Sequence, residues 1–414
     1  MKICVVHQYY LARGEPGISR YNEMARIWSE AGHEVTVIAG NVNHYTGLTP
    51  AAYRGRWITR ERDGNVLVFR CFVPSSYARS YFWRRLGYAA FTLSASFAAI
   101  VAPRADVVIA TSPPLVVVLA GWLKAKLSGW RTPWVFEVRD LWPESAVTTG
   151  VIGRRAPMTR FFYALEAWAC RSAAVINALT PAIKADIVAR RLAPADKIVE
   201  IPNGADLVHF GPGSRDNTFR RQFGWGTRCV AMYAGAHGRA NALDQLLDAA
   251  TMLRERNDIV IAFVGDGPER IRLERRSREL GLGNVSFCGP QPKERMAECI
   301  NAADIGLAVL QPNPTFRTVY PNKIFDYMAC ARPIVLGIDG VARQLVTETT
   351  RSGVFAAPGD SAALAAAIRR LTDDPAERAA MGERGRRWVE ANASREALAA
   401  HYEAVLIRLV QRRA

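Results

Sequence analysis

Cysteine is sparse in this chain, and its placement excludes two classes of protein. The seven cysteines stand far apart, and none of them forms a C-x-x-C pair. A zinc site or a disulfide framework needs closely and regularly spaced thiols. We therefore expect buried free thiols in a reducing compartment. The apolar run in MKICVVHQYY is too short for a secretory signal, so we expect a strand there and a cytoplasmic protein.

Long apolar runs are also scarce. Residues 86–102 carry no charge, but this run of 17 residues is rich in alanine and serine. It is shorter than the ~20 residues that a membrane span needs, so we expect a buried helix of the first domain. Aromatic rings and bases precede the run, a mixture that favours a membrane surface or the acceptor bound there. These residues are Phe82, Trp83, Arg84 and Arg85. An ordinary edge of the core with solvated arginines is the alternative.

Acidic residues are scarce in the first half of the chain. Residues 1–200 hold 25 Lys and Arg against 14 Asp and Glu, an excess of 11, whereas the remainder holds 29 against 24, an excess of 5. A basic half can meet nucleic acid, an anionic membrane or a phosphorylated substrate. Arginine outnumbers lysine by 47 to 7. Biased genomic composition explains that preference, but it does not explain the difference between the halves.

Hydrophobic residues are abundant enough to form a large core. Of the 414 residues, 50% are hydrophobic and 22% are charged, which suits two or three globular domains. Apolar strands alternate with helices and glycine turns, and a Gly- and Pro-rich linker, IPNGADLVHFGPG, stands around residue 202. We predict an α/β fold of two doubly wound Rossmann-like domains, residues 1–202 and 203–394. Ligands of such sheets bind in a cleft at the carboxyl ends of the strands.

Two motifs in the first domain are candidates for chemistry. Gly17 stands at a strand-to-helix turn, where glycine lets the backbone approach a phosphate or sugar, although plain turns use glycine equally often. Three charged residues, Arg139, Asp140 and Glu144, follow the strand WVFEV. A carboxylate there can hold sugar hydroxyls or support charge at a reacting carbon. The alternative is that Asp140 caps a helix.

The second domain has a glycine-rich loop, AGAHGRANALD, between a strand and a helix. Backbone N–H groups of such a loop can hold phosphate oxygens. We predict that Gly235, His237, Arg239 and Asn241 contact the donor there, although a lone histidine is more often structural than functional.

A helix near the end of this domain carries the pair Lys323 and Asp326 in YPNKIFDYMACARPIV. Residues three apart share a helix face, so the two side chains point the same way. A lysine at the positive end of a helix dipole is unfavourable until an anion binds. We predict that Lys323 holds a nucleotide diphosphate and Asp326 the ribose hydroxyls. An exposed Lys–Asp pair is the alternative.

Seven stretches resemble known motifs in their order along the chain. Five of them resemble the family 4 retaining glycosyltransferases: GEPGISRYNEMARIWSEAGHEVTV, IPNGADLVHF, VGDGPERIRLE, VSFCGPQPKERMAECINAADIGL and NKIFDYMACARPIV. IATSPPLVVVLAGW and EVRDLWPESAV resemble the subgroup that builds O-antigen, capsule and exopolysaccharide, including aminosugar transferases of the fucosamine type. The resemblance covers nearly the whole chain.

The resemblance implies the GT-B fold, with the active site between the two domains. It implies that the first domain binds the acceptor and the second binds the nucleotide-sugar donor. The C-terminal helix, residues 395–414, would cross back to the first domain. The resemblance further implies no metal and no cofactor other than the nucleotide sugar as co-substrate, and transfer with retention through an oxocarbenium-like state.

Several positions depart from the pattern of the family. Its phosphate-loop arginine and lysine fall at Ala236 and Asn241, and we predict that Lys323, with Arg317, replaces the missing positive charge. Its two glutamates fall at Thr318 and at Asp326, where the ribose role can be kept. The histidine usual in its first domain falls at Arg139, beside Asp140.

The predicted function is therefore a metal-independent retaining hexosyltransferase at the inner face of the plasma membrane. It would move a hexose or N-acetylhexosamine from a nucleotide diphosphate, UDP above others, to a lipid-diphosphate-linked saccharide at an anionic membrane surface. A GT-B sugar-nucleotide epimerase is one alternative. The other is a basic nucleic-acid-binding module, but no basic stripe interleaved with aromatic residues supports a nucleic-acid partner.

Overall fold

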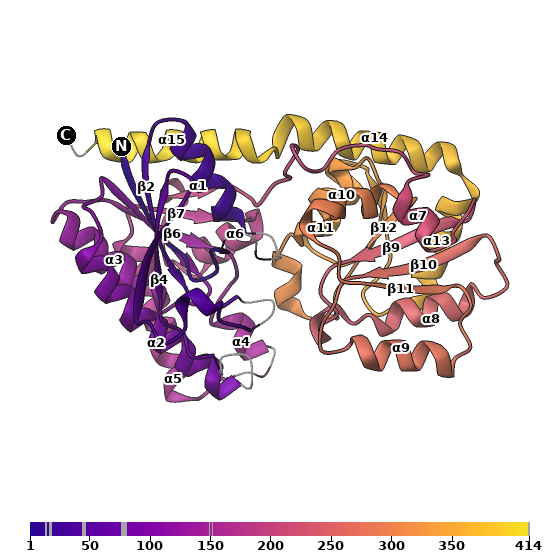
Figure 1. Cartoon of the computed structure of the whole chain (residues 1–414), viewed down its shortest axis with the longest axis horizontal. Helices are drawn as coiled ribbons and strands as arrows, with labels where there is room; N and C mark the ends of the chain where they lie inside the picture. Colours follow the sequence, from indigo (N-terminus) through magenta and orange to yellow (C-terminus); the bar gives the residue numbers. More distant parts are fainter. Residues whose placement is uncertain are drawn as a thin grey trace. The chain divides into compact units, whose positions relative to one another are not determined.

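The chain divides into two compact units (Figure 1). The computed structural model describes residues 1–12, 15, 19–43, 47–75, 81–148, 150 and 152–412. Unit 1 comprises Met1–Pro202 together with Glu396–Ala414, and unit 2 comprises Asn203–Arg395. Each unit has its own sheet and its own buried cores on the two faces of that sheet.

The sheet of unit 1 has eight strands in the order β3-β4-β2-β1-β5-β6-β7-β8. Every pairing is parallel except that of β3 with β4. The strands are β1 Lys2–Val6, β2 Glu34–Gly40, β3 Ile58–Asp63, β4 Val66–Cys71, β5 Val107–Ser112, β6 Trp134–Val138, β7 Val175–Ala178 and β8 Ile198–Glu200.

Strand β3 is not among the strands expected from the sequence. Its residues ITRERD are mostly charged, because an edge strand exposes alternate side chains to water. Only Gly64 and Asn65 separate it from β4, and Gly64 has a φ of +59°. Two residues suffice for a hairpin but not for a parallel crossover, so this pair must be antiparallel.

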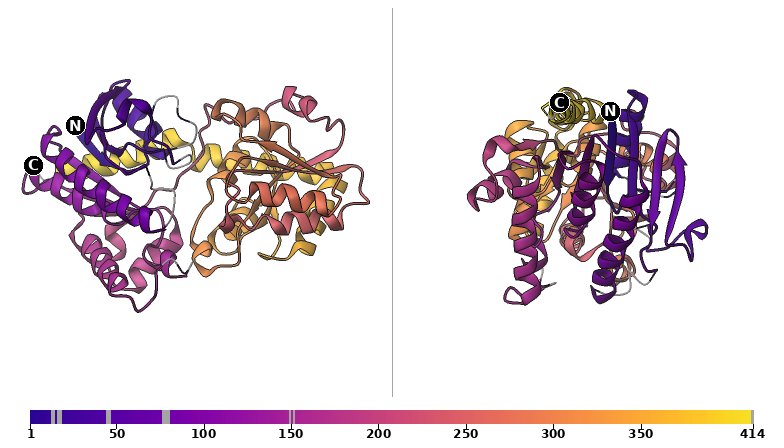
Figure 2. Two further views of the ribbon diagram at one scale, coloured as in Figure 1. Left: turned by 60° about the horizontal axis from the view of Figure 1, so that its bottom comes forward. Right: turned by 90° about the vertical axis from the view of Figure 1, so that its left-hand side faces the viewer.

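Helices cover both faces of this sheet (Figure 2). Helices α2, α3 and α5 pack on one face, whereas α1 and α15 pack on the other. The helices of unit 1 are α1 Arg20–Glu30, α2 Tyr81–Val101, α3 Val117–Ser128, α4 Glu144–Thr148, α5 Pro157–Ser172, α6 Pro181–Ala189 and α15 Arg395–Gln411, whose first residue belongs to unit 2. Among the described residues, no helix combines the length and apolarity that crossing a bilayer requires.

Helix α15 completes the core of unit 1, although it follows unit 2 in the sequence. The indole of Trp28 donates a hydrogen bond of 3.0 Å to the carbonyl oxygen of Ala399. The rings of Trp28 and Tyr402 meet edge to face, with centroids 5.6 Å apart. Tyr402 and Leu406 are fully buried in the same cluster as Trp28.

Unit 2 is a six-stranded parallel sheet in the order β11-β10-β9-β12-β13-β14. Its strands are β9 Cys229–Ala234, β10 Ile259–Val264, β11 Val285–Gly289, β12 Ile305–Val309, β13 Ile334–Gly337 and β14 Gly353–Phe355. Its helices are α7 Thr218–Gln222, α8 Asp244–Met252, α9 Arg270–Glu279, α10 Lys293–Asn301, α11 Asn322–Ala329, α12 Val341–Arg343, α13 Ser361–Asp373 and α14 Pro375–Asn392. Both sheets are thus doubly wound.

The cysteine prediction is confirmed, since all seven thiols are free and buried. Burial raises the pKa of most of them, for example that of Cys330 to about 12. These thiols are therefore protonated and shielded in the folded protein.

Candidate active site

The strand order of unit 2 indicates where a ligand binds. The chain runs outward from β9 to β10 and β11 on one side, and then returns to β12 on the other side. Such a switch point leaves a crevice at the carboxyl ends of the two central strands. Gly235 follows β9 and Leu310 follows β12. The two loops are joined by a hydrogen bond of 2.9 Å from the Gln311 N–H to the Ala240 carbonyl.

Glycines at this edge let neighbouring loops pack backbone against backbone. Gly265 has a φ of +134°, and a Cβ added there would lie 2.0 Å from the carbonyl oxygen of Gly235. Gly267 has a φ of +156°, and its added Cβ would lie 2.6 Å from the carbonyl oxygen of His237. No side chain fits at either position. We call Gly235, Gly265 and Gly267 the glycine ledge.

Helix α11 is held at the same edge by Tyr327. The Tyr327 hydroxyl accepts a hydrogen bond of 2.9 Å from the Ala234 N–H and lies 3.1 Å from the carbonyl oxygen of Leu307. Gly306 makes the close approach possible, because a Cβ there would lie 2.5 Å from the Tyr327 ring. The N-terminus of α11 is thereby fixed beside the ends of β9 and β12. Pro321 is the N-cap of α11.

Lys323 stands on the first turn of α11 without a carboxylate partner. Its Nζ lies 3.4 Å from the centroid of the Tyr233 ring. A Cβ at Gly235 would lie 3.1 Å from the same nitrogen. Burial lowers the pKa of Lys323 well below its usual value, and the charge of Asp326 opposes that shift. No ion pair of Lys323 occurs in the part of the chain that the structure describes. The ammonium group therefore lies on the glycine ledge against an aromatic ring, and the charge of Asp326 stabilises it only in part.

Asp326 lies one turn further along α11 and is only 7% exposed. The Lys323–Asp326 pair is therefore not the solvated surface pair that was the alternative interpretation. Ile324 and Met328 are fully buried, as predicted.

His237 is enclosed by aromatic rings. The ring centroids of Tyr233, Phe263 and Phe287 lie 6.1, 6.2 and 6.4 Å from that of His237. Within the described residues, neither ring nitrogen has a hydrogen-bond partner, and the side chain is fully buried. Burial, together with the nearby positive charge of Arg270, lowers the pKa of His237 to about 4. The imidazole is therefore neutral near pH 7, and a buried polar group without a partner is costly.

The remaining predicted donor residues lie apart from this cluster. The Arg239 side chain is 91% exposed and lies 3.4 Å from Glu269. Asn241 ends a short 3-10 helix, Arg239–Asn241. Arg317 pairs with Asp339 at 3.2 Å, so its charge is already balanced.

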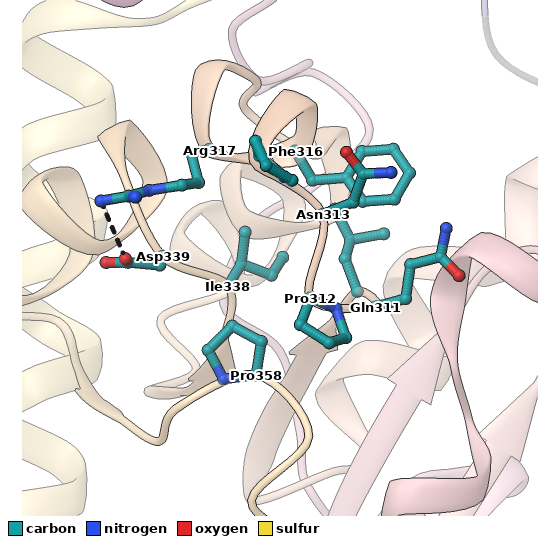
Figure 3. Close-up of a pocket in the computed structure, with 10 residues that line it drawn as sticks. Gln311, Pro312, Asn313, Phe316, Arg317, Ile338, Asp339 and Pro358 are labelled. Carbon is teal, nitrogen blue, oxygen red and sulfur yellow. Dashed lines mark ion pairs between the residues drawn. The ribbon is translucent and has the colours of Figure 1, made fainter. Parts of the chain in front are cut away.

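Arg317 and Asp339 lie at a cavity of about 260 Å³ beside the carboxyl ends of β12 and β13 (Figure 3). Much of its wall is apolar. The cavity is lined by Leu310, Gln311, Pro312, Asn313, Pro314, Phe316, Arg317, Ile338, Asp339 and Pro358. An apolar wall with polar groups at its edge suits a ligand that carries both C–H faces and hydroxyls.

The switch point of unit 1 lies between β1 and β5. His7 follows β1, and its Nδ1 lies 2.7 Å from the Oγ1 of Thr111 in β5. Both side chains are buried. Sequence reasoning missed this pair. The sequence does show that a polar residue follows the apolar run of each strand, ICVV and VVIA. It does not show that the two strands are neighbours in the sheet.

Arg139 and Asp140 follow β6 at the same edge of the sheet. The Arg139 N–H donates a hydrogen bond of 3.1 Å to the Ser112 carbonyl. Burial raises the pKa of Asp140, whereas hydrogen bonds from Ser145 and from the Leu141 N–H lower it. A desolvated carboxyl group at this edge is a candidate for hydrogen bonding with an acceptor hydroxyl.

Glu144 is held in local contacts. It begins α4, lies 3.1 Å from Arg154 and accepts a short hydrogen bond from the Tyr163 hydroxyl. Those contacts direct its carboxylate toward residues 154–163.

Two predicted contacts fall outside the described part of the chain. They are Gly17 and the side chain of Phe82. Trp83, Arg84 and Arg85 are described and exposed on the first turns of α2. In the described ranges, no cluster of three or more His, Cys, Asp or Glu side chains is arranged to hold a metal ion.

Comparison with known proteins covers most of the chain. Residues 17–204 match the family model "Glycosyl transferase 4-like domain", and residues 228–374 match "Glycosyl transferases group 1". The putative colanic acid biosynthesis glycosyl transferase WcaI of Escherichia coli K12 is 25% identical over 366 residues, which cover 85% of this chain and 88% of that one. The probable glycosyltransferase WbjE of Pseudomonas aeruginosa is 24% identical over 278 residues, or 67% of each chain.

Solved structures of the same fold match nearly the whole length of the chain. Sucrose-phosphate synthase of Thermosynechococcus elongatus superimposes with a TM-score of 0.75 at 18% identity and covers 99% of both chains. HepE of Anabaena, solved in complex with UDP, gives a TM-score of 0.71 at 17% identity, covering 99% of this chain and 100% of that one. These likenesses confirm the predicted fold of two Rossmann-like domains. The comparisons support neither the epimerase nor the nucleic-acid-binding alternative.

Proposed function

Because the chain belongs to the family 4 glycosyltransferases of the GT-B fold, which act in polysaccharide or glycoconjugate synthesis, we propose that it is a retaining hexosyltransferase. It moves a hexose or N-acetylhexosamine from UDP to a lipid-linked saccharide of a cell-surface polysaccharide. Aminosugar transfer of the fucosamine type is the narrower form of this proposal. The enzyme works without a metal at the inner face of the plasma membrane.

One observation carries the donor assignment: Lys323 lies on the glycine ledge without an anionic partner. A diphosphate supplies two or three negative charges at the place where the ammonium is desolvated and where α11 begins. The ledge has no side chains, so a phosphate group can approach the backbone closely beside Lys323. The neighbouring Asp326 accepts hydrogen bonds from ribose hydroxyls.

The other predicted contacts take supporting roles. His237 donates a hydrogen bond to a phosphate oxygen, which gives its buried imidazole the partner that it lacks. The cavity at Phe316 and Asp339 holds the transferred sugar, whose C–H face packs on the apolar wall while its hydroxyls reach the edge. In unit 1, Asp140 accepts a hydrogen bond from the acceptor hydroxyl, and Arg139 stabilises the charge that develops there.

UDP is the favoured nucleotide, in line with the UDP complex of HepE. Isothermal titration of the full chain with UDP and with GDP tests this choice. We expect the tighter binding with UDP and a loss of about tenfold or more in Lys323→Ala and in Asp326→Ala, since a hydrogen bond to a charged group contributes roughly 1.5–3 kcal/mol. The matched control is Lys184→Ala in unit 1, whose lysine pairs with Glu200. Unchanged UDP affinity in both unit 2 variants would remove the nucleotide assignment.

Transfer itself is measured with a panel of sugar nucleotides and a lipid-diphosphate-linked saccharide. Mass spectrometry identifies the donor that is consumed, and the anomeric coupling constant of the product reports retention or inversion. We expect transfer to survive a metal chelator. An inverted anomeric centre, or activity that the chelator abolishes, would contradict the corresponding part of the proposal.

A further inference from the structure

Large apolar side chains are exposed unevenly over the molecule. Of the 18 large hydrophobic residues that are exposed in the described part of the chain, only Val208, Met252 and Ile271 belong to unit 2. Eleven lie on α2, α5, or α3 and the turn that follows it. They are Trp83, Leu86, Leu93, Phe97, Ile100, Val101, Leu119, Leu127, Trp130, Met158 and Phe161. We call these eleven residues the apolar outer face.

Helix α2 is apolar on both of its sides. Its inner side buries Phe91, Ala95 and Ala98 against the sheet. Its outer side exposes Leu93, Phe97 and Ile100, which are spaced four and three residues apart and so form one stripe. Ile100 is 60% exposed. A surface helix of a globular protein normally has a polar outer side, so the outer side of α2 is built for an environment other than water.

The three helices form one layer. Helix α2 packs along α3. Helix α3 in turn meets α5 through Trp122 and Trp168, whose rings meet edge to face with centroids 5.8 Å apart. Figure 2 shows these helices side by side over one face of the sheet of unit 1. The apolar outer face is therefore one continuous surface. Single exposed apolar residues are normal in a globular protein, but a continuous apolar surface of this kind marks an interaction site.

The charge around this surface has one sign. From residue 64 to residue 136 the sequence holds eight Lys and Arg and a single acid, Asp106. Asp106 is engaged by the backbone N–H of Lys2 at 2.7 Å. The only carboxylate of α2, α3 and α5 is Glu166, which is buried and paired with Arg190. The exposed bases on these helices or next to them in the sequence are Arg84, Arg85, Arg104, Arg131, Arg154, Arg155, Arg160 and Arg171, of which Arg154 pairs with Glu144.

Aromatic rings stand next to bases at the edge of the surface. The Nζ of Lys126 lies 4.6 Å from the centroid of the Trp130 ring, and this tryptophan is 79% exposed. Trp83 precedes Arg84 at the first turn of α2. Tryptophan beside a base is the combination found at the level of lipid headgroups, where the ring is half in hydrocarbon and the cation meets phosphate.

We propose that the apolar outer face docks on an anionic lipid bilayer, with α2 lying in the plane of the interface. The stripe of α2 enters the acyl boundary, and the surrounding arginines contact anionic headgroups. Charge selects this occupant over a second copy of the chain, because two copies would bring the same bases together. Helix α2 has 21 residues and is therefore about 30 Å long. In this proposal its axis lies parallel to the membrane surface and does not cross the bilayer.

This inference rests on the proposed function and deepens it. A lipid-linked acceptor diffuses in the membrane, and the apolar outer face specifies how unit 1 reaches it. The inference extends the four-residue patch predicted from the sequence to three helices, and it assigns the main binding energy to apolar insertion rather than to charge.

Vesicle sedimentation of the full chain tests the inference without any nucleotide, so its outcome is independent of donor binding. The vesicles are phosphatidylcholine with and without phosphatidylglycerol. We expect binding that requires phosphatidylglycerol and that falls about tenfold or more in Ile100→Ser, since burying such a side chain contributes roughly 1.5–3 kcal/mol. The matched control is Ile271→Ser on α9, an isoleucine of unit 2 that is 80% exposed and so even more open to solvent than Ile100. Equal vesicle binding of the two variants overturns the proposal.

A second measurement reports insertion directly. Because all seven native thiols are buried, Ile100→Cys and Ile271→Cys can each be labelled at the new thiol with a polarity-sensitive dye. On addition of vesicles we expect a blue shift at position 100 and none at position 271. No shift at either position overturns the proposal. A dimer that Ile100→Ser converts to a monomer, without vesicle binding by the wild-type chain, also overturns it, in favour of a second copy.

Discussion

Lys124 of unit 1 is buried and Lys323 of unit 2 is partly buried, and the two lysines differ in what surrounds them. Lys124 of unit 1 is 1% exposed, and its Nζ donates hydrogen bonds of 3.1 and 2.7 Å to the carbonyl oxygens of Ala99 and Ala102. Lys323 of unit 2 has only the Tyr233 ring beneath it. Burial lowers the pKa of both. Lys124 therefore has a structural role, because its ammonium already donates hydrogen bonds to carbonyl groups at the end of α2. Lys323 makes no such bonds to any described residue, so its ammonium can bind an anion.

The largest expected effect comes from disturbing the backbone around Lys323. We expect Gly265→Ala to lower the free energy of unfolding by about 4 kcal/mol, because the new Cβ would overlap the Gly235 carbonyl and the φ of +134° is strained for alanine. Urea denaturation measures the change. Gly281→Ala is the control, with a φ of +63° and open space around its Cβ, and costs about 1 kcal/mol. Similar losses in the two variants would show that the glycine ledge is not closely packed.

Lys124→Met tests the structural member of the pair. The substitution leaves two carbonyl groups at the end of α2 without their donor, so we expect a loss of about 2–3 kcal/mol in the free energy of unfolding. UDP affinity should not change. A variant that is as stable as the wild type would remove the structural role of Lys124.

Lys323→Met is expected to change stability in the opposite direction. Methionine removes a desolvated charge that has no carboxylate partner, so we expect the free energy of unfolding to stay constant or to rise by about 1 kcal/mol. UDP affinity should fall about tenfold or more in the same variant. A destabilisation like that of Lys124→Met would mean that both lysines are structural, and the comparison would fail.

The smallest effect is a pH dependence at His237. Its folded-state pKa, about 4, lies below the usual 6.5, so the unfolded chain binds a proton that the folded chain does not. Stability is therefore lost as the pH falls from about 6.5 toward 4. At pH ~5.5 the loss in the free energy of unfolding is about 1 kcal/mol. Urea denaturation of wild type and His237→Phe at pH ~7 and at pH ~5.5 isolates the contribution. An identical pH dependence in both proteins would mean that His237 does not titrate in this way.

The sequence predicted those parts of the candidate site that are local. Lys323, Asp326 and the glycine loops each stand within one strand–turn–helix unit, so spacing alone places them at the carboxyl edge of a sheet. The buried thiols and most strand positions of both units follow from apolar runs in the same way, whereas the charged edge strand β3 and the three-residue strands β8 and β14 do not. The sequence was sufficient to predict a feature wherever all of its residues lie within one such unit.

Features that need two distant segments were not predicted. The contact of His7 with Thr111 depends on β1 and β5 being neighbours, and the sequence does not reveal this because the two residues are 104 positions apart. The pairing of Arg317 with Asp339 was missed for the same reason, so Arg317 was assigned to the diphosphate. The exposed stripe of α2 was read as buried, because an apolar helix looks the same in a sequence whether its outer side meets protein or another apolar medium.

Helices α2 and α9 extend the comparison to the surface. Both cover a doubly wound sheet, but α9 reads RIRLERRSRE, with acids and bases interleaved, whereas the outer side of α2 is apolar. Among the described residues, α9 makes ion pairs within itself and to α8, such as Arg276 with Asp248 at 2.6 Å. The outer surface of α9 in unit 2 is therefore polar and suited to water, whereas that of α2 in unit 1 is apolar.

The packing of Tyr402 and Leu406 against Trp28 has a consequence for biosynthesis. A ribosome completes residues 203–395 before it makes the helix that closes the N-terminal core. The half of the protein that is translated first must therefore wait, with that face of its sheet covered by α1 but not by α15, until residues 395–411 have been made. Residues 203–395 can be packed before that, so the order of synthesis and the order of completion of the two units are reversed.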